Sequence, residues 1–152
     1  MQLCLWFITK LVACSAPLGM ETGLIKDAQI TASSEWDPNH AALQGRLNFL
    51  AVPGKAGSWS AKYNNQGQWI QVDLLAYTKV TRTATQGRNA FAQWVTKYGL
   101  QYSEDGLHFI HYREPGQSSP KVQISQVSFF RAFVLSFHSR SLRMTQSSDN
   151  SS

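Results

Sequence analysis

The sequence predicts an all-β fold, an antiparallel β-sandwich or jelly-roll-like barrel, from three observations. In residues 68–74 apolar side chains alternate with polar ones, as in a half-buried strand. Residues 79–85 are rich in β-branched side chains, which favour strands. Residues 98–103 alternate again, and an Asp-Gly pair follows where a hairpin would turn. The side chains expected to face the core are Ile70, Val72, Leu74, Tyr98, Leu100 and Tyr102.

The remaining strands and loops are predicted from turn-forming residues and from helix-breaking proline and glycine. A short strand is expected at 29–33, after an approach loop. Residues 35–66 contain Pro38, Pro53 and several glycines, which exclude a long helix and predict loops. The hairpin returns at 109–112. Strands at this spacing, without helical periodicity, are typical of sandwiches and barrels.

The composition limits the classes of function. The chain has 152 residues, enough for one domain, and 43% hydrophobic residues can form its core. Only 15% of the residues are charged, below the roughly 25% of average soluble domains, which suits an extracellular β-rich surface. The net charge of +5 has two interpretations, a mildly basic solvated surface or attraction to anionic membranes and sulfated glycans. Lysines and arginines are spread singly, so nucleic acid is not an expected partner.

The two ends of the chain differ from its middle. Residues 1–16 contain broken apolar runs and small residues, which fit a signal segment or leader, or a mis-assigned start. The segment is too short and too interrupted for a transmembrane helix. Residues 126–152 are first apolar, without turn residues, and from Ser139 rich in serine, so we expect disorder at the end.

No catalytic constellation is apparent, so the chain is not expected to be an enzyme. The sequence has no Gly-x-Ser-x-Gly elbow, and its histidines have no evident nucleophile or orienting acid. His108 and His111, three residues apart on a strand, would point to opposite faces and are poor joint metal ligands. Cys4 and Cys14 lack metal-site spacing. No metal or cofactor is expected, although calcium can bind through backbone carbonyls that a sequence does not reveal.

Short segments in a fixed order carry a family resemblance. Together they resemble the discoidin, or coagulation-factor type C, domain, and this places a discoidin-like domain at residues 17–125. The segments are PLGMETGLI (17–25), DAQITASS (27–34), GRLN (45–48), WSA (59–61), QWIQVDL (68–74), TQGR (85–88), WVTKY (94–98) and YSEDG (102–106).

The resemblance also implies a partial, C-terminally truncated domain. The family's opening cysteine corresponds to Cys14, and the closing cysteine that would bond it is absent. Residues 126–152 do not resemble the family's closing strands, so the sandwich is expected to be incomplete at its C-terminal end. Loss of so long a disulfide loop forgoes about 4 kcal/mol, and one interpretation is a marginal, non-functional product.

The resemblance implies recognition by loops at one end of the barrel, a role that suits loops on a rigid scaffold. Membrane-binding members place apolar tips, here Trp36 and Phe91, above a basic collar, here Lys55 and Arg88. Sugar-binding members use an aromatic and polar platform. The alternative for Trp36 and Phe91 is simple packing. The predicted ligand-binding residues are Trp36, Asp37, Asn39, His40, Lys55, Arg88, Asn89 and Phe91.

Other conspicuous side chains are expected to be structural. Trp59, Trp69 and Trp94 are predicted at the core or its edge, and Arg46 and Asp73 in a buried ion pair or hydrogen-bond hub.

The leading hypothesis is therefore an extracellular, secreted or cell-surface adhesion module that recognises glycans or a cell-surface or matrix protein. The alternatives are a module for anionic phospholipid and the non-functional product. The oligomeric state is not encoded in any pattern of this sequence.

Overall fold

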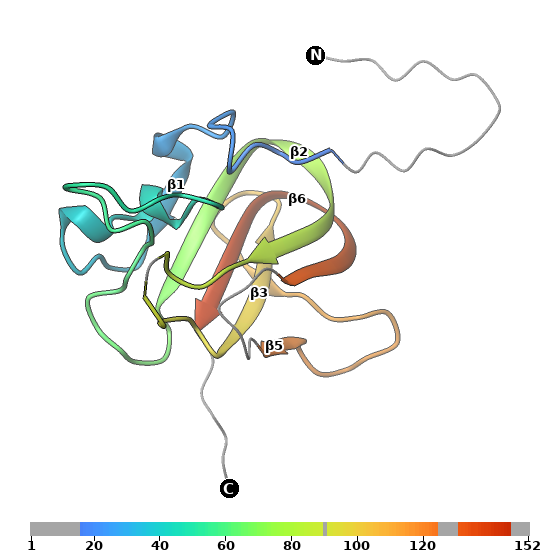
Figure 1. The fold of residues 1–152 in the computed structure, drawn as a ribbon. Helices are drawn as coiled ribbons and strands as arrows, with labels where there is room; N and C mark the ends of the chain where they lie inside the picture. Colours follow the sequence, from blue (N-terminus) through green and yellow to red (C-terminus); the bar gives the residue numbers. More distant parts are fainter. Residues whose placement is uncertain (1–15, 90, 125–130, 147–152) are drawn as a thin grey trace, which may run out of the picture.

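The strands of the computed structural model confirm the all-β prediction (Figure 1). It describes residues 16–89, 91–124 and 131–146. All strand pairs are antiparallel and form one six-stranded sheet in the order β1-β2-β6-β3-β4, with β5 beside β3. The strands are β1 (Ile30–Ala32), β2 (Trp69–Thr85), β3 (Lys97–Ser103), β4 (Ile110–His111), β5 (Val122–Ile124) and β6 (Arg131–Gln146). Three short 3₁₀ turns precede β2: η1 (Asp27–Gln29), η2 (Pro38–His40) and η3 (Ala42–Gly45).

The first core cluster lies under the first half of β2. Buried Ile25, Ile30 and Ala42 pack against the apolar side chains of the alternating segment, as predicted. The two expected strands at 68–74 and 79–85 are one long strand that bends between Asp73 and Thr78, where its register with β6 shifts. These packed side chains are Ile70, Val72 and Leu74.

The second core cluster confirms the hairpin. Leu100 of β3 and Tyr112, after β4, are buried and pack against Tyr102. Gly106 supplies the positive φ, 79°, that the turn requires. Asp105 accepts backbone hydrogen bonds from the two residues after Gly106, which closes the turn.

The C-terminal segment requires the largest correction. Residues 126–152 were expected to lie outside the domain, but β6 lies between β2 and β3 in the sheet. The Ser-rich composition concealed a strand, because Ser139 and Ser141 are buried in it and the Ser139 hydroxyl forms its hydrogen bonds inside the protein. Ser139 Oγ lies 2.9 and 2.6 Å from the carbonyl oxygens of Ser103 and Ser141, either of which can accept its one hydroxyl proton. Disorder was expected from Ser139 onward, and this is wrong for residues 139–146, which belong to β6. Residues 147–152 lie outside the described residues, as do 126–130.

The N-terminal predictions also lie outside the described residues, since Cys4, Cys14 and all but Ala16 of the expected leader precede them. Among the residues that are described, no helix has the length and apolar character needed to cross a bilayer.

Arg46 and Asp73 are structural, but they do not pair with each other. Arg46 is buried and donates to Asp27 Oδ1 and to the carbonyl of Met20, so it joins η3 to the N-terminal approach. Asp73 Oδ1 accepts from the amide of Leu75 at 2.8 Å, at the bend of β2.

Candidate binding surface

Backbone hydrogen bonds join the first two predicted loops. The first loop is residues 35–40 and the second is residues 50–57. Ala56 N donates to the carbonyl of Asn39 at 2.9 Å. Ser60, just after the second loop, exchanges backbone bonds with Trp36 and His40 at 2.9 and 3.2 Å. The two loops therefore hold each other in place.

The third loop, residues 88–93, is attached to the second by a side chain. Asn89 Oδ1 accepts from the amide of Ala51 at 3.2 Å. Within the second loop, Val52 and Lys55 exchange backbone bonds at 3.0 and 2.8 Å and form a tight turn. Gly57 closes this loop at a φ of +71°, and a Cβ there would lie 2.8 Å from Ala51 N. Only glycine fits at this close approach.

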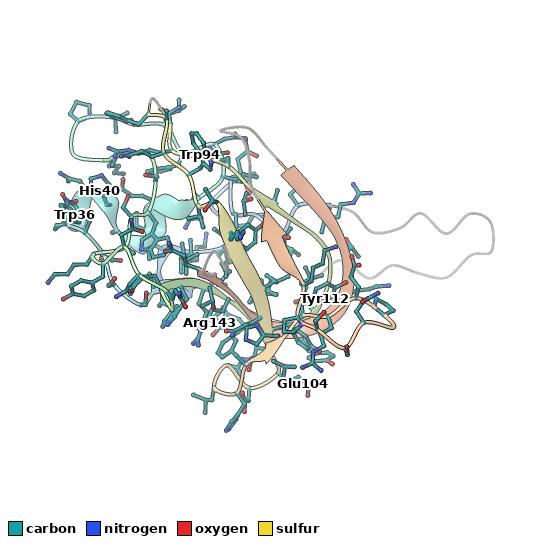
Figure 2. The ribbon with its side chains drawn as sticks, turned by 90° about the horizontal axis from the view of Figure 1, so that it is seen from below. Trp36, His40, Trp94, Glu104, Tyr112 and Arg143 are labelled. Atoms are coloured by element: carbon teal, nitrogen blue, oxygen red, sulfur yellow. The ribbon has the colours of Figure 1, made fainter. Side chains whose placement is uncertain are left out.

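All three loops thus lie at one end of the sandwich, as the resemblance implied. In Figure 2, Trp36 and His40 lie together at one side of the molecule, and Glu104, in the β3–β4 turn, lies on the opposite side. We call the end formed by residues 35–40, 50–57 and 88–93 the loop end. We call the end formed by residues 75–77 and 104–110 the turn end.

The polar members of the predicted site are mostly engaged within the loops. Asp37 Oδ1 lies 2.7 Å from His40 Nδ1, and this hydrogen bond lowers the pKa of Asp37. Arg88 Nη1 donates to Gln93 Oε1 at 2.8 Å, and its guanidinium lies 4.1 Å from the centre of the Phe91 ring. With Asn89 bonded to the second loop, these groups position the loops before any ligand arrives.

The apolar members remain uncovered. Trp36 is 63% exposed and Phe91 is 55% exposed. Leu50 and Val52 of the second loop are also exposed, and they are not among the residues predicted from the sequence. The sequence did contain a signal for their exposure. Two large apolar residues precede or flank a Pro-Gly turn in a loop that is otherwise poor in core residues. The exposed Lys55 is the cation of the same loop.

The remaining tryptophans have different roles. Trp59 packs against the first core cluster and donates its indole N–H to the carbonyl of Ser34 at 2.9 Å, as expected for a core-edge residue. Trp69 is partly buried and stacks on the guanidinium of Arg143, 4.2 Å away. Trp94 is 39% exposed, so it lies at most at the edge of the core, the weaker form of its predicted position. It follows a loop and lies at the surface before β3 begins.

A second polar cluster, at the turn end, superficially resembles a catalytic triad. Asp105 accepts from Ser103 Oγ at 2.9 Å and lies 2.6 Å from His108 Nδ1. The carboxylate therefore separates the hydroxyl from the imidazole, and Ser103 is buried. A nucleophile needs direct contact with its base, so this cluster stabilises a turn. Among the described residues, no group of three His, Cys, Asp or Glu side chains is placed to hold a metal ion.

Comparison with known sequences identifies clear relatives. The F5/8 type C domain profile matches residues 29–151. Human EGF-like repeat and discoidin I-like domain-containing protein 3 is 42% identical over 74% of the chain and 25% of that protein. Pig coagulation factor V is 41% identical over 72% of the chain and 5% of its own length. Rat lactadherin is 35% identical over 86% of the chain and 35% of its own length. The chain therefore spans a small part of each of these relatives.

Solved structures share the fold. Discoidin II from Dictyostelium discoideum superimposes with a TM-score of 0.69 at 20% identity, over 77% of the chain and 48% of that structure. The family 32 carbohydrate-binding module of NanJ from C. perfringens, solved with galactose, gives 0.57 at 16% identity over 84% and 88%. At these identities the similarity establishes the architecture alone.

Proposed function

Because the chain belongs to the F5/8 type C domain family, we propose that it is an extracellular binding module whose loop end docks on anionic phospholipid surfaces. The observation that carries the proposal is the exposure of apolar side chains on three mutually bonded loops. These side chains are Trp36, Leu50, Val52 and Phe91.

The engagement of the polar groups favours a membrane over a sugar as the ligand. A sugar platform needs free donors and acceptors around an aromatic face. At the loop end Asp37, Arg88 and Asn89 already bond to other loop residues. Exposed apolar tips, by contrast, gain free energy when they enter the headgroup boundary, about 25 cal/mol per Å² of apolar surface removed from water.

The cations of the loop end add electrostatic attraction. Lys55 is exposed beside the apolar tips, and Arg88 lies against the Phe91 ring. A cation near an anionic leaflet contributes about 1 kcal/mol. The preference for anionic over neutral lipid is therefore expected to come from these two residues, and most of the affinity from the apolar tips.

Glycans, the ligand class that the sequence favours, are the second candidate. The observation that favours them is that the exposed ring of Trp36 and the exposed amide of Asn39 belong to the same loop, one able to stack on a sugar and the other to bond its hydroxyls. A structural neighbour was solved with galactose. We propose no catalytic activity for either candidate.

The deciding experiment is vesicle sedimentation with the purified chain. We expect binding to phosphatidylcholine vesicles that contain phosphatidylserine, and little binding to phosphatidylcholine alone. Replacement of Trp36 and Phe91 together by alanine is expected to weaken binding about thirtyfold or more, since each exposed ring is expected to contribute about 1–2 kcal/mol. The matched control is Leu107→Ala with Ile110→Ala, which removes exposed apolar side chains at the turn end.

The outcomes separate the candidates. Binding that falls only in the loop-end pair supports the phospholipid proposal. Equal loss of binding in both double variants contradicts it, because nonspecific hydrophobic adsorption would then explain the binding. Absence of vesicle binding, together with retention on immobilised galactose that free galactose reverses, would replace the phospholipid by a glycan.

A further inference from the structure

A fourth segment, residues 60–63, lies beside the first loop. The carbonyl of Ser60 accepts a hydrogen bond from the amide of Trp36 at 2.9 Å. The amide of Lys62 donates to Ser34 Oγ at 3.1 Å. The two contacts follow in opposite order along the two segments, which therefore run antiparallel to each other. We call residues 60–63 the flanking segment.

The flanking segment exposes an aromatic ring and an ammonium group. Tyr63 is 54% exposed, close to the 63% of Trp36. Lys62 is exposed as well, and its Nζ lies 5.6 Å from the centre of the Tyr63 ring. The Lys62 ammonium forms no ion pair with a carboxylate of the described residues. Both side chains are therefore accessible to a ligand that reaches Trp36.

The flanking segment also changes the charge balance of the loop end. The three loops carry the cations Lys55 and Arg88. They carry the carboxylates Glu35 and Asp37 as well, so that these formal charges cancel. Lys62 is a third cation, and it gives the combined surface an excess of positive charge. Such an excess is what an anionic leaflet attracts.

The pair of side chains is suited to the headgroup level of a bilayer. A tyrosine ring is apolar over most of its surface but carries a hydroxyl that stays hydrated, and such rings are enriched at membrane–water interfaces. A lysine lays its methylene stem along an apolar layer and directs its ammonium to charged groups. A neutral sugar could stack on the ring but would gain little from the ammonium. The pair therefore favours an anionic, lipid-like ligand.

We propose that the flanking segment is a further part of the phospholipid-binding surface, with Lys62 as a contact for anionic headgroups and Tyr63 as an interfacial anchor. This inference rests on the phospholipid function proposed above. It extends the contact from the three loops to the flank beside Trp36, which lies on the side of the molecule opposite Glu104 (Figure 2). The ammonium increases the preference for phosphatidylserine, and the ring adds affinity for any lipid surface.

Vesicle sedimentation separates these two contributions. Lys62→Gln is expected to weaken binding to phosphatidylcholine vesicles that contain phosphatidylserine about fivefold, and to lower its sensitivity to salt. Tyr63→Ala is expected to weaken binding about threefold at every phosphatidylserine content. The matched controls, Lys79→Gln and Tyr77→Ala, remove an exposed cation and an exposed ring near the bend of β2. Both controls should bind as the wild type does.

Fluorine NMR tests the contact in the protein with its native surface. The chain is labelled with 3-fluorotyrosine, and the variants Tyr63→Phe and Tyr77→Phe assign the two resonances. Phosphatidylserine vesicles that carry a gadolinium chelate on a lipid headgroup are compared with vesicles that carry lutetium. We expect gadolinium to broaden the Tyr63 resonance more than that of Tyr77, which is similarly exposed at 61% but lies at the turn end. Equal broadening overturns the anchor.

The outcomes distinguish this inference from the function on which it rests. If the wild type binds the vesicles and the double variant of Trp36 and Phe91 loses that binding, the phospholipid function stands. Equal binding by Lys62→Gln and Lys79→Gln then overturns the flanking contact alone. If the wild type does not bind, both fall together. Lys62 and Tyr63 are exposed and make no described side-chain hydrogen bond, so their variants are expected to unfold at the wild-type Tm.

Discussion

The two ends of the sheet both expose large apolar side chains, but they differ in charge and in the hydrogen bonds that hold them. The loop end carries Trp36 and Phe91 beside cations. The turn end carries Leu75, Tyr77 and Leu107, all exposed, but next to acidic side chains. Glu104 accepts from the Tyr77 hydroxyl at 3.3 Å, and Asp105 closes the adjacent turn. Exposure alone would therefore not tell which end meets a membrane.

The balance of charge makes the distinction. The cations Lys55 and Arg88 at the loop end are matched by Glu35 and Asp37. The turn end carries Glu104 and Asp105 without a Lys or Arg, so an anionic leaflet repels the turn end more.

The two ends also differ in construction. Contacts between segments far apart in the sequence hold the loop end, such as the bonds from Ala56 N to Asn39 and from Ala51 N to Asn89. Contacts over two or three residues hold most of the turn end. A substitution in one loop should therefore also displace the other loops of the loop end, whereas a substitution at the turn end should have a local effect.

Glycine substitutions give the largest expected effect and test this difference in construction. Gly57→Ala would force a Cβ to within 2.8 Å of Ala51 N, on backbone that cannot rotate away. We expect a loss of more than about 2 kcal/mol of unfolding free energy and at least a tenfold loss of vesicle binding. Denaturant unfolding and vesicle sedimentation provide the two measurements.

Two other glycines serve as controls for that substitution. Gly54, in the same loop, and Gly106, at the turn end, also have positive φ values, but a Cβ at either meets no contact shorter than 3.4 Å. Gly54→Ala and Gly106→Ala should each cost about 1 kcal/mol from backbone strain alone. A Gly57→Ala variant no less stable than these two would show that the loops are not tightly joined.

A buried serine near the turn end gives the next largest effect, on stability alone. Ser139 Oγ donates to Ser103 O and accepts from Ser103 N, so it joins β6 to β3. Ser139→Ala removes these buried hydrogen bonds and is expected to cost about 2 kcal/mol. Vesicle binding per folded molecule should not change. Reduced binding by the fully folded variant would show that the two ends are coupled.

The charge argument predicts a smaller effect at Lys55. Lys55→Gln removes one exposed cation from the loop end, and binding to phosphatidylserine vesicles should weaken about fivefold, with a lower sensitivity to salt. Arg113→Gln removes the same charge from an exposed position next to Tyr112, away from the loops. Equal weakening by both variants would indicate that overall charge, and not a defined face, drives binding.

Sequence patterns predicted the features that are determined by residues close together in the chain. Alternation identified the core face of β2, and the Asp-Gly pair identified the β3 hairpin. The same reasoning failed for β6, because hydropathy treats Ser139 and Ser141 as surface residues when they are buried. A strand whose polar side chains bond to neighbouring strands has no signature until those strands are known.

The candidate site was predictable only through the family resemblance. No local pattern brings Asn39, Ala51 and Asn89 together, because their contacts depend on how the chain folds back on itself. Leu50 and Val52 were overlooked for a related reason. Whether an apolar loop residue is buried or exposed is decided by what packs over it, and the sequence does not state this.

The smallest expected effect is the pH dependence of the turn end. The hydrogen bond with Asp105 raises the pKa of His108 above its ordinary value of 6.5. The stabilising contribution of protonated His108 is therefore complete below pH 6.5 and is lost as the pH rises through the raised value. Hydrogen bonds, the one with His108 first, lower the pKa of Asp105, so its contribution is lost only in strong acid.

Thermal unfolding at a series of pH values measures this effect. Between about pH 6 and pH 8, where a histidine titrates, the Tm of the wild type should fall slightly. The fall should vanish in His108→Ala and persist in His111→Ala, whose imidazole bonds to Gln101 instead of a carboxylate. Vesicle binding by His108→Ala should match the wild type, because the pair lies at the end that faces away from the proposed membrane surface. A fall in Tm that survives in His108→Ala would assign the titration to another group.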